Sequence, residues 1–170
     1  MPVQEKDSGT CESGALISIK KATGPGAPTP GNTYDWQYEV TVEACEDLDY
    51  VTAQGGTNGW APLKNRLDSD QAGSALHPSD DTFATVRNAN KKNEVILWTI
   101  GAMNFGDKET LTVDLRGSIP PQTPDCQLRY LSGPWSATYK IGDVTQKSDY
   151  TGRVTIFVTL DGDSSDCGTP

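Results

Sequence analysis

Residues 93–117, NEVILWTIGAMNFGDKETLTVDLRG, decide the fold, because two strand-like runs flank a short turn there. The first run, Glu94 to Ile100, is apolar at nearly every position, so we expect it to be buried on both faces. The second run, Glu109 to Leu115, alternates between apolar and polar residues. That period of two is typical of a strand with one solvent-facing side. Gly106-Asp107 supplies the turn between the runs, and the stretch therefore predicts two core strands.

Strand patterns continue on both sides of this stretch. The clearest is Tyr34 to Ala44, where aromatic and β-branched residues alternate with polar ones. Other short runs are residues 15–21, 49–54, 82–87, 127–131, 136–141 and 153–160. No window shows a sustained helical period. Eight or nine short strands with turn signals between them predict an all-β antiparallel sandwich over residues 15–160, with a polar N-terminal extension, 1–14, and a polar tail, 161–170.

The chain also resembles the DUF11 domain, a repeat unit of bacterial and archaeal surface proteins. The second half of that domain is matched by Trp98, Gly101, Gly106, Asp107, Thr110, Leu111, Thr112 and Val113. The first half is matched by a Pro30-Gly31 turn and then Trp36, Tyr38, Val40, Thr41 and Val42. Glu43 to Asp47 departs from the usual Asn-Thr-Gly turn of the family. The resemblance, over residues 15–118, implies an immunoglobulin-like sandwich with a structural or adhesive role and no catalytic residues.

Composition and charge narrow the classes of partner. The chain has 170 residues and a formal net charge of −9, so its surface repels nucleic-acid phosphates and anionic lipid headgroups. No apolar stretch reaches the length of about eighteen residues that a membrane-spanning helix needs. Met1 to Gly14 lacks the apolar core of a signal peptide. We therefore expect no nucleic-acid partner and no membrane insertion. Either a signal peptide was removed before residue 1, which fits a location that is extracellular or at the cell surface, or the protein is not exported by that route, which fits a virion or spore.

Four cysteines, Cys11, Cys45, Cys126 and Cys167, lie far apart and form no C-x-x-C pair, which argues against a zinc site. Two disulfides are the natural interpretation, and three connectivities are possible. The preferred pairing joins the two tail residues, Cys11 with Cys167, and the two residues at strand edges, Cys45 with Cys126. The alternative is free buried thiols, which behave as small apolar groups.

Catalytic patterns are not evident, so we expect that the protein is not an enzyme. The only histidine is His77, and no serine or cysteine lies in a nucleophile elbow. Trp60 and Trp135 each neighbour Gly or Pro, and they are candidates for an interface or a sugar-stacking site. The more ordinary interpretation of both is a tryptophan that closes the core.

No cofactor is predicted, and calcium is the one metal with any support. Asp161, Asp163 and Asp166 lie close together in the C-terminal tail, and clustered oxygens suit hard cations. The segment lacks the glutamate that closes an EF-hand loop, and most such tails are simply disordered.

The leading functional hypothesis is a non-enzymatic structural subunit of an extracellular or particle-surface assembly that packs with copies of itself, as a filament or a surface layer. Residues 1–14 could add a strand to a neighbouring copy, with Cys11 locking the joint. The alternatives are a carbohydrate- or receptor-binding adhesive module and a phage decoration protein.

Overall fold

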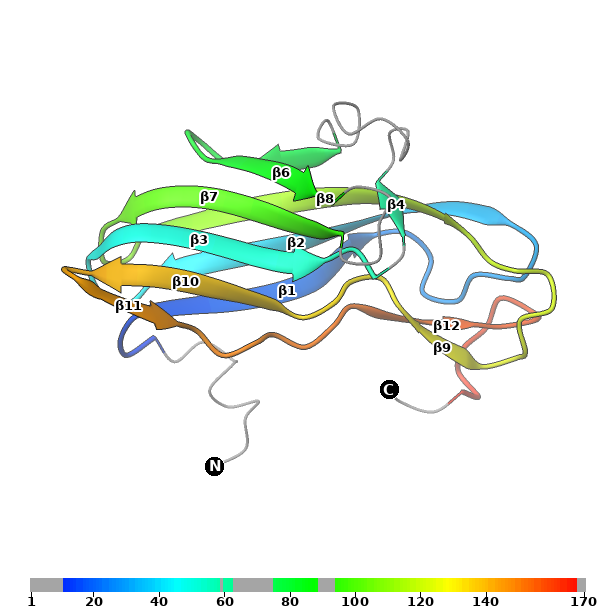
Figure 1. The fold of residues 1–170 in the computed structure, drawn as a ribbon. Helices are drawn as coiled ribbons and strands as arrows, with labels where there is room; N and C mark the ends of the chain where they lie inside the picture. The colour runs from blue at the N-terminus through cyan, green and yellow to red at the C-terminus, as the bar shows by residue number, and fades with distance from the viewer. Residues whose placement is uncertain (1–10, 59, 63–74, 89–93, 168–170) are drawn as a thin grey trace.

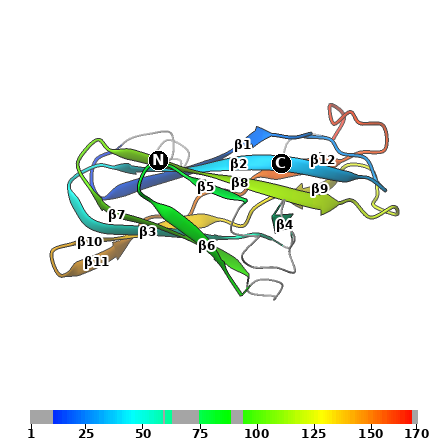
Figure 2. The same ribbon diagram turned by 90° about the horizontal axis from the view of Figure 1, so that it is seen from above.

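The structure, a computed structural model, describes residues 11–58, 60–62, 75–88 and 94–167, and these residues form an immunoglobulin-like β-sandwich. Figure 1 shows the elongated domain, and Figure 2 separates its two layers. The described residues contain twelve strands, and every pairing between them is antiparallel. None of the described residues belongs to a helix that is long and apolar enough to span a membrane.

The first layer, sheet A, has the order β1-β2-β8, with two short strands at the free edge of β8. Its strands are β1 (Ala15–Thr23), β2 (Thr33–Ala44), β8 (Lys108–Ser118), β4 (Ala61–Pro62) and β5 (Leu76–Pro78). The β2–β8 pairing is the longest among the described residues and runs from Thr33 opposite Ser118 to Glu43 opposite Lys108. These are the two stretches in which the sequence alternates most regularly, so each strand can bury one face without a break.

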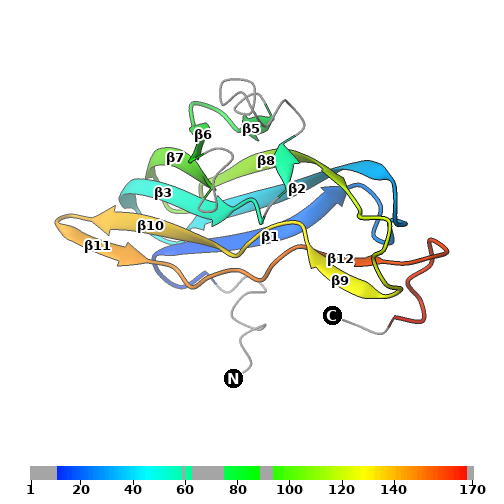
Figure 3. The ribbon, with the colours of Figure 1, turned by 45° about the vertical axis from the view of Figure 1, so that its right-hand side comes forward.

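The second layer, sheet B, has the order β11-β10-β3-β7-β6. Its strands are β3 (Leu48–Gly56), β6 (Phe83–Arg87), β7 (Val95–Met103), β10 (Trp135–Ile141) and β11 (Val144–Lys147). A separate two-stranded ribbon, β9 (Gln127–Tyr130) with β12 (Thr155–Val158), extends from one end of the sandwich (Figure 3).

Alternate residues of the two sheets meet in a single core. Sheet A contributes Trp36, Tyr38, Val40, Val42, Leu111, Val113 and Leu115, all fully buried. Sheet B contributes Val51, Ala53, Ile96, Trp98, Trp135 and Ala137. This interdigitation of two inner faces is the usual core of a sandwich.

All nine predicted strands are present, and the all-β sandwich prediction is confirmed. The structure adds three short strands, β4, β5 and β11. The expectation that Glu94 to Ile100 is buried on both faces is wrong for the outer face, because Ile96 and Trp98 are buried whereas Val95 and Leu97 are half-buried.

Two disulfides are present, as expected, but the preferred pairing is wrong. Cys11 is bonded to Cys45, and Cys126 is bonded to Cys167. The reason is strand register: Ala15 lies opposite Ala44, so the residues just outside that pair meet at one end of sheet A. In the same way Gln127 lies opposite Val158 in the ribbon. The first bridge therefore closes the outer end of the β1–β2 pair, whereas the second joins Cys126, directly before β9, to Cys167 in the loop that follows β12. The Cα atoms of the two bridges are 5.1 and 5.2 Å apart.

This pairing also corrects the idea that Cys11 locks a joint between copies, because that cysteine is used within its own chain. Cys11 to Gly14 is held against the sandwich by the bridge and by the Cys45 N–H, which donates to the Gly14 carbonyl at 2.8 Å. Residues 1–10 and 168–170 of the predicted extension and tail lie outside the described residues.

Candidate functional site

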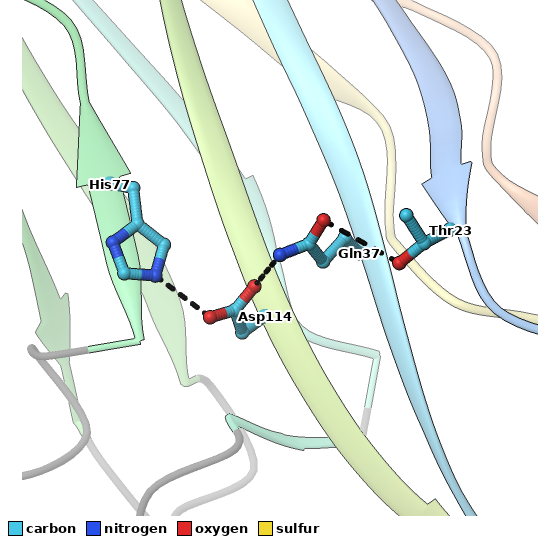
Figure 4. Close-up of polar contacts among 4 residues, drawn as sticks. All are labelled: Thr23, Gln37, His77 and Asp114. Carbon is cyan, nitrogen blue, oxygen red and sulfur yellow. Dashed lines mark hydrogen bonds and ion pairs between the residues drawn. The ribbon is translucent and has the colours of Figure 1, made fainter.

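A row of four hydrogen-bonded side chains crosses the outer face of sheet A (Figure 4). The Asp114 carboxylate lies at its centre and receives the Gln37 amide N–H at 2.7 Å on Oδ1. Its Oδ2 lies 2.7 Å from His77 Nε2. Thr23 Oγ1 extends the row to Gln37 Oε1 at 3.5 Å. The four residues come from β1, β2, β8 and β5, which places them side by side only after folding.

The row fixes β5 to the edge of β8. The Asp114 side chain is 12% exposed and that of His77 is 53% exposed, so the carboxylate is shielded and the imidazole faces water. The Asp114 main-chain N–H donates to the Ala75 carbonyl at 3.0 Å, which anchors the residue before β5 as well. An Asp–His pair can orient an imidazole for base catalysis. Within the described residues, however, no serine or cysteine hydrogen-bonds the His77 ring, so the pair is best explained as a clasp on β5.

Trp60 and Trp135, the predicted interface or ligand aromatics, are buried, so neither is available for those roles. The Trp60 indole N–H donates to the Tyr130 carbonyl at 2.6 Å, and its ring packs against Trp36 with centroids 5.0 Å apart. Trp135 is fully buried and fills the space above Gly55, where an added Cβ would lie 2.2 Å from the indole nitrogen. The sequence could not distinguish these sites from exposed ones, because Gly and Pro neighbours suit both.

The predicted calcium residues use their oxygens within the C-terminal loop. Asp161 Oδ1 accepts the Asp163 N–H at 3.0 Å, and Asp163 Oδ1 accepts the Ser165 N–H at 2.8 Å. The second bond lowers the pKa of Asp163. Among the described residues no three or more His, Cys, Asp or Glu side chains form a group that could hold a metal, Asp166 included. Calcium binding by this loop stays a prediction.

The outer face of sheet B is a surface that the sequence analysis missed. We call it the B face and define it by the outward residues of the five strands. These are Phe83, Thr85, Arg87, Val95, Leu97, Thr99, Thr52, Gln54, Thr138, Lys140, Thr145 and Lys147. Ser136 shares this side of β10 but is buried. Phe83 is 59% exposed although it lies in a strand, which marks a large apolar side chain left open to solvent. Tyr50, opposite Lys140, is 46% exposed at one border of the face.

Threonines run in a row across the B face. Thr99, Thr52 and Thr138 are direct neighbours on β7, β3 and β10, with Phe83 at one end of the row and Lys147 at the other. Beyond Lys147 lies Tyr150, whose ring centroid is 4.3 Å from the ammonium nitrogen. The row is therefore weakly polar and bordered by two aromatic rings.

The two outer faces differ in charge. The outward strand positions of the B face carry three cations, Arg87, Lys140 and Lys147. The exposed carboxylate of Asp49 in β3 lies at the border of the face, where it accepts the Gly142 N–H at 2.6 Å. The outer face of sheet A pairs its charges instead, as in Arg116 with Asp35 at 2.8 Å and Lys20 with Glu39 at 3.6 Å. Because the whole chain carries a net charge of −9, the B face is a basic surface on an acidic protein.

Comparison with known proteins found no family model and no curated protein that matches this chain. Solved structures with a similar fold include an exo-β-N-acetylglucosaminidase from Vibrio harveyi, at 8% identity and a TM-score of 0.46. That match covers 86% of this chain and 19% of the enzyme, so the chain spans less than a fifth of the enzyme's length.

Two further matches are the RrgA Jo.In complex and BcpA, the major pilin subunit of Bacillus cereus. The first has 12% identity and a TM-score of 0.48, over 80% of this chain and 76% of that one. The second has 12% identity and a TM-score of 0.39, over 85% of this chain and 40% of that one. Likeness at this level says nothing about what the chain binds or does.

Proposed function

We propose that this chain is a non-enzymatic structural subunit of an extracellular or particle-surface assembly and that it packs against copies of itself. The observation that carries the proposal is the covalent closure of both ends of the sandwich by Cys11–Cys45 and Cys126–Cys167. Disulfides of this kind persist in oxidising surroundings and are rare in a reducing cytosol. The DUF11-like pattern of turns and strands supports the same role.

The B face is the contact that we propose between copies. It offers exposed aromatic side chains and half-buried threonines together with the cations Arg87, Lys140 and Lys147. The turns at both ends of the domain are acidic, with Glu46 and Asp47 at one end and Asp125 with the C-terminal aspartates at the other. A basic face and acidic ends on one chain complement each other between copies, and such a contact weakens as salt screens the charges.

Sedimentation velocity of the full chain at increasing protein concentration tests this proposal. We expect species larger than the monomer at low ionic strength, with their proportion falling as salt is added. The double variant Lys140→Glu/Lys147→Glu reverses the charge of the B face and should remain monomeric. The matched control is Lys20→Glu on the outer face of sheet A, which should assemble like the parent. A parent chain that stays monomeric under all conditions would overturn the proposed self-assembly.

An adhesive role is the second candidate, and the exposed rings of Phe83 and Tyr50 favour it. Exposed aromatic side chains on a flat sheet can stack on sugar rings or anchor a protein interface. A monomer that binds glycans, and loses that binding in Phe83→Ala and Tyr50→Ala, would support this function over self-assembly. The Trp60 and Trp135 rings cannot serve here, because both lie in the core.

A further inference from the structure

The two disulfides determine how tension would pass through the domain. A pull on the chain enters at Cys11, crosses the first bridge to Cys45, and leaves from Cys126 across the second bridge to Cys167. The segments enclosed by the bridges, which contain β1 with β2 and β9 with β12, lie off the covalent path. β2 is still loaded, because its last residue, Ala44, is joined directly to Cys45, where the force enters. The geometry points to a tension-bearing function, in which the bridges divert force from the weak ends of the domain into the longest strand pairing of the core.

The two points at which force enters the body belong to opposite ends of the β2–β8 pairing, since Cys45 follows the end at which Glu43 lies opposite Lys108 and Cys126 follows the end at which Thr33 lies opposite Ser118. The β9–β12 ribbon extends from this second end (Figure 1). Cys45 directly follows β2, where that strand turns into β3. Cys126 lies beyond the C-terminal end of β8, next to the β9–β12 ribbon. Because β2 and β8 are antiparallel and each is pulled from its own C-terminal end, the two strands are drawn past each other along their length.

This direction of loading is shear, and in shear the hydrogen bonds of a strand pair resist together. The same bonds would open one after another if both strands were pulled apart at one end. The β2–β8 pairing runs without a register shift from Thr33 opposite Ser118 to Glu43 opposite Lys108. It continues at one end through the Ile119 N–H to the Asn32 carbonyl, 2.9 Å, and at the other through the Ala44 N–H to the Asp107 carbonyl, 2.9 Å.

The core adds to this resistance. Tyr38 and Val40 of β2 and Leu111 and Val113 of β8 are fully buried, so sliding the strands would also expose these side chains. Burial of apolar surface opposes that exposure in proportion to its area. The sheared pair is therefore also the centre of the hydrophobic core.

The second bridge protects the weakest part of the fold. Without it, tension would act on the end of β12, which pairs with β9 only from Thr155 to Val158. The outer side of β12 adds single hydrogen bonds such as the Phe157 N–H to the Gly26 carbonyl at 3.0 Å. Such a short ribbon would detach first, and Cys126–Cys167 removes it from the path.

The bridges also limit how far the domain can extend. Of the 156 residue steps between Cys11 and Cys167, the two loops take up 34 and 41, and 81 remain free to extend. At about 3.3–3.6 Å per residue, 81 steps correspond to about 270–290 Å, less the length that the folded domain already spans. Full extension of 156 steps would give about 510–560 Å.

Single-molecule force spectroscopy on the oxidised full chain, held by its two ends, tests the inference without any mutation. Unfolding should release the length of the shorter path. Dithiothreitol added while the unfolded chain is held under force should then release two further steps, about 110–120 Å for the first loop and about 135–150 Å for the second. Release of the length of all 156 residue steps before reduction would show that the disulfides do not shorten the path of tension, and it would overturn the inference. The inference concerns one chain, so it stands whether or not copies assemble.

Changing the attachment points tests the shear. A handle at Phe105, in the exposed turn between β7 and β8, replaces the C-terminal handle, while the N-terminal handle is kept. Both forces then act at the same end of the sandwich and open the strand pairs one bond at a time. We expect unfolding at a lower force than with handles at the two ends. Equal unfolding forces in the two geometries would overturn the assignment of the β2–β8 pairing as the resisting element.

Discussion

Tyr38 and Trp135 pack against each other across the core, with ring centroids 6.4 Å apart. Among the described residues, neither the Tyr38 hydroxyl nor the Trp135 indole nitrogen makes a hydrogen bond of good geometry, and both are buried. Burial has the larger effect on the pKa of Tyr38, although the indole N–H lies near enough to the hydroxyl to lower that pKa. An unpaired polar atom in a core costs free energy, because it has lost its bonds to water. Burial also raises the pKa of Tyr38 well above its ordinary value.

The variant Tyr38→Phe should therefore leave the free energy of unfolding at pH 7 unchanged or raise it by up to about 1 kcal/mol. The raised pKa of folded Tyr38 gives stability that is complete below about pH 10, the unfolded value, and is lost as the pH rises towards the folded value. Urea unfolding between pH 7 and 11 should show a smaller alkaline loss in the variant than in the parent.

Part of the loss of stability at alkaline pH should remain in Tyr38→Phe, because the pKa of Tyr139 is also raised, by burial and by the nearby carboxylates of Glu46 and Asp149. The control is Tyr50→Phe, at a tyrosine that is 46% exposed, which should behave like the parent. Equal alkaline loss in Tyr38→Phe and in the parent would show that the Tyr38 hydroxyl is not buried.

Trp98 is the largest side chain that β7 contributes to the core, and it is fully buried. Its indole N–H donates to Thr82 Oγ1 at 3.0 Å. Trp98→Ala should lower the free energy of unfolding by about 3–5 kcal/mol, the usual cost of emptying a buried aromatic site. Phe83→Ala, on the neighbouring strand but 59% exposed, is the control and should change stability little. A melting temperature equal to the parent's in Trp98→Ala would contradict the inward orientation of β7.

At the scale of elements, the sequence predicted the strands that carry an alternating apolar face and missed the short ones. β11 follows a Gly142-Asp143 turn that could have been recognised, and Gly142 adopts a positive φ of 60° there. All four residues of β11 are exposed, so it has no apolar face to reveal it. β5 contains only three residues and ends in Pro78, and its place beside β8 depends on contacts that are distant in sequence.

The disulfide pairing and the polar row were missed for the same reason. Both depend on register across strands, which sets Cys11 beside Cys45 and His77 beside Asp114. Alternation predicts which side of a strand is buried, but it does not state which residue lies opposite. Phe83 shows that alternation can also mislead, because an apolar residue in the edge strand β6 points outward to solvent although the strand alternates regularly.

The clasp on β5 can be tested through Asp114. Asp114→Ala removes the acceptor of both Gln37 and His77, so the free energy of unfolding should fall by about 1–3 kcal/mol. Hydrogen exchange should also speed up at the main-chain N–H of position 114, which donates to the Ala75 carbonyl in the parent. The control Asp35→Ala removes an exposed pair with Arg116 and should cost about 0–1 kcal/mol. Unchanged exchange in Asp114→Ala would mean that β5 is held by its main chain alone.

At the scale of the whole molecule, three features belong together. The sandwich is elongated, its ends are acidic and covalently closed, and one broad face is basic and carries exposed aromatic side chains. A closed end resists fraying, because the bridged residues cannot separate even when the nearby strands open. An open face remains available for contact. A module built in this way suits repeated contact and tension better than it suits the enclosure of a substrate.

Non-reducing peptide mapping by mass spectrometry, on protein isolated from its natural source, tests the central claim most directly. We expect two cross-linked peptides, one containing Cys11 with Cys45 and one containing Cys126 with Cys167, and no cysteine that alkylates before reduction. That result would place the folded chain in oxidising surroundings with both ends closed. Free thiols, bridges between chains, or a bond between Cys45 and Cys126 would contradict the strand register, the proposed location and the path of tension together.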